Sequence, residues 1–275
     1  MEKKLTIIIP VYNNKSVRTT LESVRAIKNN EIELVVIDGK STDGTDKIIT
    51  EFEEIIDVFI SEKDRNVHEA INKGIDKANS EWIFTLAADD KLICDPIKII
   101  NKYGGECDLI CGNLIIDHGE GKYLIGRSDA DLSQLEIKCI LRHPATFFKK
   151  STYDKYGKYD ESLKCAGDRD IFLRLYKKGA KIRVIKECIV LFQIGGISTR
   201  NPIKYAYKED VLISDRYQIN KIKTRIFYIK RCLLFYGHRI KDILGIKHKL
   251  RYLNKKDLFE ELKGTGVETD VIEKI

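Results

Sequence analysis

The chain lacks several features that would place it in common protein classes. Its 275 residues contain no run near 18 apolar residues, so no membrane-spanning helix is expected. The short apolar run near the N-terminus is followed by no cleavage-site pattern, which argues against a signal peptide and favours a cytoplasmic protein. Neither G-x-G-x-x-G nor G-x-x-x-x-G-K-[ST] occurs, so both common glycine-rich phosphate loops are missing.

Cysteine and charge are unevenly distributed along the chain. The seven cysteines are scattered, and Cys107 and Cys111 have no second pair at zinc-site spacing, so reduced and mostly buried thiols are expected. Acidic and basic residues balance over residues 1–200, so the whole surplus of +7 lies in residues 201–275. This shift predicts a boundary near Asn201, followed by a basic C-terminal extension.

Apolar runs alternate with amphipathic segments over the first 95 residues. Strands are predicted at 5–11, 34–37, 58–60 and 82–87, and helices at 17–27, 48–52 and 67–78. This order predicts βαβ units in an α/β fold, with a Rossmann-like, mostly parallel sheet flanked by helices. Beyond residue 95 we predict short strands at 109–111, 114–116, 145–148, 182–185 and 189–192, and a helix over 168–178.

The most informative segment is 82–90, where an apolar run ends in Asp89 and Asp90. A buried strand with this ending places two carboxylates at the edge of an open α/β sheet, where such sheets bind ligands. Adjacent carboxylates repel unless a cation compensates, and Mn²⁺ or Mg²⁺ would also bind a diphosphate. The alternative is a surface turn in which the pair caps a helix. Strand ends at 11–13, 38 and 88–90 should meet at one edge, which favours a metal site with the Asp90 side chain at that edge.

Motifs over residues 4–200 resemble those of family 2 glycosyltransferases. In chain order they are Ile-Ile-Ile-Pro-Val-Tyr-Asn at 7–13, Thr-Leu-Glu-Ser-Val at 20–24, Ile-Asp-Gly-Lys-Ser-Thr-Asp-Gly-Thr at 37–45, Ser-Glu-Lys-Asp-Arg at 61–65, Glu-Ala-Ile-Asn-Lys-Gly-Ile at 69–75, Ala-Ala-Asp-Asp at 87–90, His-Pro-Ala-Thr-Phe-Phe at 143–148, Gly-Asp-Arg-Asp-Ile-Phe-Leu-Arg at 167–174 and Gly-Gly-Ile-Ser at 195–198. Their order and spacing carry the resemblance. It implies a GT-A fold with a nucleotide-binding half over 1–95, an acceptor-binding half over 96–200 and a helical appendage over 201–275.

The resemblance also implies a reaction and its residues. The reaction is a metal-dependent, inverting transfer of a sugar from a nucleoside diphosphate donor, most often a UDP-sugar, to a hydroxyl of a glycan or polyprenyl-linked acceptor. The implied nucleotide contacts are Pro10, Val11, Tyr12, Asn13, Asp38, Arg65 and Asp89. Asp90 would hold Mn²⁺ or Mg²⁺, and Asp168 would take the proton of the acceptor hydroxyl.

Two positions depart from the family pattern. Relatives carry two acidic residues after the second strand, whereas Gly39 replaces the second acidic residue here. Asp38 must then contact the nucleobase of the donor alone, or not at all. Gly167 replaces the glutamate that usually precedes the catalytic aspartate. Asp168 is alternatively a helix N-cap, and Arg65 is alternatively a solvated loop residue.

Three further side chains are assigned a structural role or are left between two roles. Asp170 precedes Arg174 by four residues, which predicts an i,i+4 ion pair. His68 has no partner at ligand spacing and is interpreted as structural. His143 either packs or faces the acceptor.

The C-terminal extension carries a basic amphipathic pattern over 221–256. Its apolar positions are Ile222, Ile226, Ile229, Leu233, Tyr236 and Ile240, with cations and aromatics between them. This pattern is typical of a helix in an anionic membrane surface, so peripheral contact with the inner face of the cell membrane is expected. The alternative is packing on the catalytic domain or on a second subunit of a homodimer. No nucleic-acid partner is expected, because residues 1–200 show no such chemistry.

Two other functions fit parts of the pattern. A sugar-phosphate nucleotidyltransferase also uses a sheet and a metal, but it needs a glycine- and arginine-rich loop where this chain has Pro10-Val-Tyr-Asn-Asn. A glycan-binding protein that kept the fold and lost the chemistry is supported only by Gly39 and Gly167. The presence of Asp89, Asp90 and Asp168 favours an active enzyme.

Overall fold

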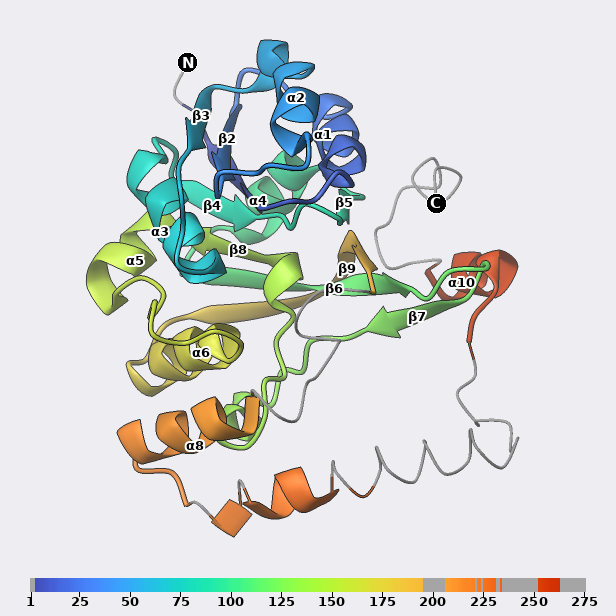
Figure 1. The fold of residues 1–275 in the computed structure, drawn as a ribbon. Helices are drawn as coiled ribbons and strands as arrows, with labels where there is room; N and C mark the ends of the chain where they lie inside the picture. The colour runs from blue at the N-terminus through green and yellow to red at the C-terminus, as the bar shows by residue number, and fades with distance from the viewer. Residues whose placement is uncertain are drawn as a thin grey trace.

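The computed structural model describes residues 3–194, 206–220, 222–223, 225–230, 233 and 252–262. Its centre is one nine-stranded sheet with the order β3-β2-β1-β4-β8-β6-β9-β5, to which β7 is added through β6. Helices cover both faces of this sheet (Figure 1). The described part is therefore a layered α/β structure, as the alternating pattern predicts.

The elements of the first 90 residues follow the predicted order, whereas β5, α4, β7 and α5 fall where no element was predicted. The strands are β1 (Leu5–Val11), β2 (Ile32–Asp38), β3 (Val58–Ser61), β4 (Trp82–Thr85), β5 (Lys91–Leu92), β6 (Leu109–Asp117), β7 (Tyr123–Gly126), β8 (Thr146–Lys149) and β9 (Ile182–Gln193). The helices are α1 (Val17–Arg25), α2 (Thr45–Thr50), α3 (Val67–Lys77), α4 (Pro96–Tyr103), α5 (Lys150–Tyr156), α6 (Gly167–Lys177), α8 (Ala206–Arg216) and α10 (Lys255–Leu262), with 3₁₀ turns at Glu53–Ile55, Leu132–Glu136 and His143–Ala145. The four short strands predicted within 109–116 and 182–192 are in fact two long strands, because β6 and β9 pair in parallel across a register shift near Asn113.

The N-terminal half of the sheet is parallel. β1 lies between β2 and β4, and β3 follows β2, all in the same direction. Every residue of β1 and β2 is buried, which explains their continuous apolar sequence. The register aligns Val11 with Asp38 and Asp38 with Ser61. The C-terminal ends of these strands therefore share one edge, while β8 runs antiparallel to β4 and begins the mixed half.

Helices after residue 200 also pack on the sheet domain. Ile213 of α8 is fully buried in the hydrophobic cluster formed with α3, α5 and α6. Leu258 and Leu262 of α10 pack with Tyr123 of β7. The predicted boundary near Asn201 lies outside the described residues. Among the helices that are described, none has the length and apolar character needed to cross a membrane.

Candidate active site

Two turns, one after β1 and one after β2, border the site. Gly39 donates its N–H to the carbonyl of Val11 at 2.8 Å, and the Asn13 N–H donates to Ser41 Oγ at 2.8 Å. Asn13 and Lys40 have positive φ values of 45° and 71°, which are uncommon for residues other than glycine. These turns redirect the chain sharply after β1 and β2. Tyr12 consequently projects outward with 64% of its surface exposed.

Two adjoining clefts open at this edge of the sheet. The carboxylate cleft, of about 650 Å³, is lined by both Asp89 and Asp168. The basic cleft, of about 820 Å³, is lined by Lys40, Lys63, Arg65 and Lys164, together with Asp64. The wall common to both consists of Pro10, Val11, Tyr12, Val67, Lys164 and Cys165. The residues predicted to contact the nucleoside thus border these clefts. Both clefts are bordered by Pro10, Val11 and Tyr12, and the carboxylate cleft is bordered by Asn13.

Asp89 and Asp90 have different environments. Asp89 is partly exposed in the carboxylate cleft, and desolvation raises its pKa. Asp90 is fully buried, contrary to the predicted edge position. The reason is that the chain turns inward after β4: Thr20 Oγ1 donates to the Asp90 carbonyl at 2.7 Å, and the Gln193 N–H donates to Asp90 Oδ1 at 3.0 Å.

The second carboxylate oxygen of Asp90, Oδ2, tests whether this residue fits the predicted metal ion. Asp90 Oδ2 is buried without a hydrogen-bond partner. Burial raises the pKa of Asp90 to about 8, despite the bond from Gln193 and with a further contribution from the charge of Asp89. The described residues hold no cluster of three or more metal-ligating side chains. Mg²⁺ is commonly bound by one or two carboxylates plus substrate phosphates, so this pair fits a divalent cation that a ligand helps to hold.

Asp168 lies in the first turn of α6, and 45% of its side chain is exposed. The N-cap of α6 is Ala166, so the N-cap interpretation of Asp168 is wrong. Asp168 Oδ1 is 3.7 Å from His143 Nδ1, while His143 Nε2 lies 2.5 Å from the hydroxyl of Tyr159. Burial lowers the pKa of His143, although Asp168 opposes this shift. His143 therefore faces Asp168 as a neutral imidazole near pH 7.

Asp170 is held away from the cleft. It is fully buried, and its carboxylate lies 3.5 Å from Arg174 Nη1, which confirms the predicted i,i+4 ion pair. Arg216 Nη1 donates to Asp170 Oδ1 at 2.8 Å, and the hydroxyl of Tyr217 donates to the same oxygen at 3.1 Å. These contacts assign Asp170 a structural role.

The structure gives a reason for glycine at position 167. A Cβ atom there would lie 2.2 Å from His68 Nε2, so no side chain fits unless the ring moves. His68 is buried and lines the carboxylate cleft, and its Nδ1 is 2.7 Å from the carbonyl oxygen of Leu163. His68 thus occupies the space that the side chain of the usual glutamate would need.

The acidic positions after β2 are rearranged. Asp38 is fully buried and lines neither cleft, because its carboxylate accepts hydrogen bonds from the Ser41 N–H at 3.1 Å and from Ser61 Oγ at 2.6 Å. A Cβ atom at Gly39 would lie 3.3 Å from Asp64 Oδ2. Asp64 therefore brings a carboxylate into the basic cleft close to Gly39, where the second acid is missing.

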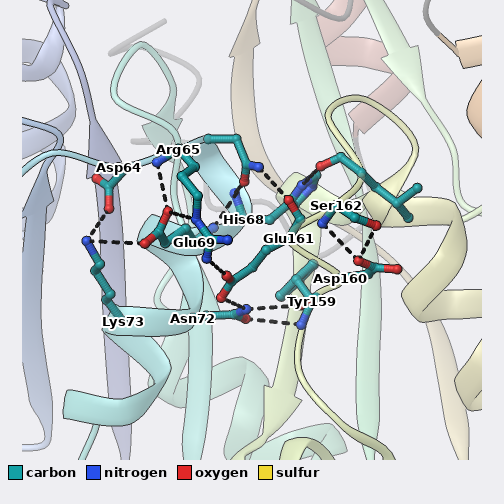
Figure 2. Close-up of polar contacts among 12 residues, drawn as sticks. Asp64, Arg65, His68, Glu69, Asn72, Lys73, Tyr159, Asp160, Glu161 and Ser162 are labelled. Atoms are coloured by element: carbon teal, nitrogen blue, oxygen red, sulfur yellow. Dashed lines mark hydrogen bonds and ion pairs between the residues drawn. The ribbon is translucent and has the colours of Figure 1, made fainter.

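Arg65 borders the basic cleft, but its charge is engaged by glutamates (Figure 2). Its Nε donates to Glu69 Oε2 at 2.8 Å, and its Nη2 donates to Glu161. The neighbouring Asn66 donates from Nδ2 to the Glu161 carbonyl at 2.7 Å. Arg65 thus ties the start of α3 to the segment that precedes α6.

Several lining residues were not singled out by the sequence. Lys164, Cys165 and Gln193 border the carboxylate cleft, and His68 lines it although the sequence predicts a structural role. The only local signal for Lys164 is its position four residues before Asp168. The predicted Gly-Gly-Ile-Ser motif at 195–198 lies outside the described residues.

Comparisons with known proteins identify the family. The model of glycosyl transferase family 2 matches residues 6–174. A PGL/p-HBAD biosynthesis glycosyltransferase of Mycobacterium tuberculosis H37Rv is 28% identical over 203 residues, which cover 70% of this chain and 78% of the relative. A poly-beta-1,6-N-acetyl-D-glucosamine synthase of Staphylococcus aureus COL is 25% identical over 272 residues, covering 90% of this chain and 64% of the synthase.

Solved structures confirm the predicted GT-A fold. S. aureus TarS 1–349 in complex with UDP-GlcNAc matches with a TM-score of 0.62 at 16% identity, covering 98% of this chain and 82% of that one. A Pyrobaculum calidifontis mannosyltransferase in complex with GDP-Man and Mn²⁺ matches with a TM-score of 0.60 at 14% identity, covering 80% of this chain and 65% of that one. The family match spans more than half of the sequence and includes Asp89, Asp90 and Asp168. The chain therefore belongs to glycosyl transferase family 2 and is a glycosyltransferase.

Proposed function

We propose that the chain transfers a sugar, with inversion, from a nucleoside diphosphate sugar to a hydroxyl of a glycan or lipid-linked oligosaccharide. The observation that carries this proposal is the meeting of Asp89 and Asp168 in one cleft, beside a basic cleft large enough for a nucleotide. Asp89 follows a strand of the parallel half, and Asp168 lies in the first turn of α6, which comes after β8 and α5 in the chain, so the cleft joins both halves. TarS was solved with UDP-GlcNAc, which supports a nucleotide sugar and favours a UDP-sugar.

Asp168 is the proposed general base. Its exposed carboxylate would accept the proton of the acceptor hydroxyl while that oxygen bonds to the anomeric carbon. The bond from that carbon to the diphosphate breaks at the same time, and the nucleoside diphosphate leaves as an anion. His143 lies 3.7 Å away, and because burial lowers its pKa the imidazole leaves the charge of Asp168 uncompensated.

Mn²⁺ or Mg²⁺ is the proposed cofactor, held by Asp90 with Asp89 beside it. When bound, such an ion would offset charge on the diphosphate leaving group. The unpartnered Oδ2 of Asp90 supports this assignment, because a buried carboxylate oxygen without a donor is costly unless a cation compensates. The mannosyltransferase solved with GDP-Man and Mn²⁺ has the same fold.

Donor hydrolysis with a panel of nucleotide sugars, with and without Mn²⁺, tests the proposal. Asp168→Asn keeps the shape of the side chain but cannot accept a proton, so transfer should fall by about 10²–10⁴-fold while donor binding survives. Asp154→Asn, an exposed carboxylate on α5 that lines neither cleft, is the matched control. A loss under tenfold in Asp168→Asn would move the base elsewhere. A wild-type chain that binds glycans but cleaves no donor would instead support the binding-protein alternative.

Calorimetric measurement of binding affinity for the same nucleotide sugars tests the metal site. Wild-type chain should bind its nucleotide more tightly with Mn²⁺ than in EDTA. Asp90→Asn should bind it equally in both buffers, because the amide removes the charge that attracts the cation. Mn²⁺-enhanced binding that persists in Asp90→Asn would show that the metal is held by other residues.

The basic extension is proposed to bring the active site to an anionic membrane that carries the acceptor. Ile222, Ile226, Ile229 and Leu233 are between 47% and 69% exposed, whereas Tyr228 is buried and hydrogen-bonded to Asp210. Within residues 222–230 the described cations are Lys223, Arg225 and Lys230, all exposed. The predicted stripe positions Tyr236 and Ile240 lie outside the described residues.

Liposome co-sedimentation tests the membrane role. At low salt the full chain should pellet with anionic vesicles and not with neutral ones, because each cation near the surface contributes about 1 kcal/mol. Ile226→Ser/Ile229→Ser should weaken this binding without changing donor hydrolysis. Equal binding to both vesicle types, or none, would favour a role of the stripe in a homodimer, which sedimentation velocity would detect.

A further inference from the structure

Lys164 lies on the wall that the two clefts share. We propose that Lys164 binds the diphosphate of the donor, between the nucleoside and the transferred sugar, and that Glu209 positions the loop from which it projects. This inference rests on the proposed function, because it assumes a nucleoside diphosphate donor. Lys164 precedes Asp168, the proposed general base, by only four positions. One short loop would therefore carry both the residue that binds the leaving group and the residue that accepts the proton.

The arrangement of charges in the basic cleft favours Lys164 over Arg65 as the residue that binds the diphosphate. Four cations line this cleft, and of these Lys164 also lines the carboxylate cleft that holds Asp89. The guanidinium of Arg65 is engaged by Glu69 and Glu161. Lys164 is exposed and forms no ion pair within the part of the chain that is described. Its charge is therefore available to an anionic ligand at the junction.

Helix α3 holds one end of the loop that carries Lys164 (Figure 2). Asn72 makes paired hydrogen bonds with the backbone of Tyr159, at 2.9 Å to its carbonyl and 3.0 Å from its N–H. His68 Nδ1 lies 2.7 Å from the carbonyl oxygen of Leu163, immediately before Lys164. The backbone leading to Lys164 is thus held by α3 up to the neighbouring residue.

Helix α8 holds the other end through one carboxylate. Glu209 accepts hydrogen bonds from three consecutive backbone N–H groups, those of Lys164, Cys165 and Ala166, each at 2.8 Å. Charge-assisted hydrogen bonds of this kind are among the stronger ones in proteins. Because the backbone is fixed on both sides, only the Lys164 side chain must be ordered when a ligand binds, which lowers the entropic cost of the contact.

Calorimetry with UDP and GDP, in Mg²⁺ buffer, tests the inference, with uridine and guanosine binding followed by ligand-detected NMR. Lys164→Met should weaken binding of the preferred diphosphate by about ten- to hundredfold, the usual range for a hydrogen bond to a charged group. Binding of the matching nucleoside should be unchanged. Lys178→Met, an exposed lysine at the C-terminal end of α6, is the charge-matched control. Glu209→Gln should give a smaller loss confined to the diphosphate, because the loop is loosened while Lys164 is retained.

The outcomes separate this inference from the proposed function. If wild-type chain binds UDP or GDP and Lys164→Met binds it equally well, Lys164 is not the diphosphate contact, and the proposed transfer reaction stands. An equal loss for diphosphate and nucleoside would also overturn the assignment, since it would indicate a general disturbance of the cleft. If the wild-type chain binds neither UDP nor GDP, nor any other nucleoside diphosphate of the donor panel, the donor class is wrong and this inference falls with it.

Discussion

Gly167→Ala should destabilise this glycosyltransferase even though it places an alanine in a helix. The added Cβ would lie 2.2 Å from His68 Nε2, 2.6 Å from Cε1 and 2.9 Å from Cδ2, all closer than non-bonded atoms approach. The ring has little room to retreat, because it is buried, stacked on Tyr159 at 5.7 Å and bonded to the Leu163 carbonyl. The substitution therefore forces a shift of His68 or of the start of α6.

The two opposing contributions predict the sign of the effect. In the middle of a helix glycine is less stable than alanine by about 0.5–1 kcal/mol, so at this first position of α6 the exchange would be stabilising by at most that amount if the space were open. Overpacking of a filled core costs about 1–3 kcal/mol. We expect the free energy of unfolding to fall by about 1–2 kcal/mol. Domains of 150–250 residues lose about 2–4 °C in Tm for each kcal/mol, so the Tm should fall by several degrees.

Thermal and urea unfolding of four proteins measure this effect as a double-mutant cycle. They are wild type, Gly167→Ala, His68→Ala and the double variant. His68→Ala alone loses the bond to Leu163 and should be destabilised. In that background Gly167→Ala should become neutral or stabilising, because the obstructing ring is gone. Equal destabilisation by Gly167→Ala in both backgrounds would refute the steric explanation, as would an unchanged Tm of the single variant.

Two further predictions concern charges that tie α8 to the catalytic domain. Burial alone would raise the pKa of Asp160, but hydrogen bonds from Ser162 and Arg216 outweigh it and lower the pKa to about 2. This folded-state pKa is below the ordinary aspartate value, so the stabilisation is complete above about pH 4 and is lost as the pH falls toward 2. Screening by solvent at this partly exposed carboxylate limits it to at most about 2 kcal/mol. Urea unfolding from pH 2 to 6 should show wild type and Asp160→Asn converging at the acid end, and a constant difference would contradict the shift. Asp210→Asn leaves Arg169, which is 3% exposed and 3.0 Å from Asp210, without its counter-charge, and should cost about 3–5 kcal/mol in urea unfolding. The exposed pair of Asp76 with Lys158 is the control, because Asp76→Asn should cost under about 1 kcal/mol, and equal losses would show that α8 is only loosely attached.

The local pattern of the sequence was sufficient for most elements of the fold. Continuous apolar runs predicted β1 and β2 because both faces of a parallel strand are buried. The 3.6-residue period predicted α3 over nearly its observed span. The ends of these elements share one edge of the sheet, so Asp89 and the residues 10–13 were correctly expected near each other. Each of these inferences needs only residues within one element or the rule that parallel strands end together.

Contacts between distant segments were decided by the tertiary structure. The burial of Asp90 depends on Thr20 and Gln193, which are 70 and 103 residues away in sequence. The requirement for glycine at 167 comes from His68, and the position of Lys164 depends on Glu209, 45 residues later. No periodic pattern encodes these pairs, because side-chain period reports which face of an element is buried and not which loop will lie against it. The sequence alone determined the strands and helices of the parallel half and the acidic motif, whereas the order of strands in the sheet and the packing of α3 and α8 decided which side chains surround the site.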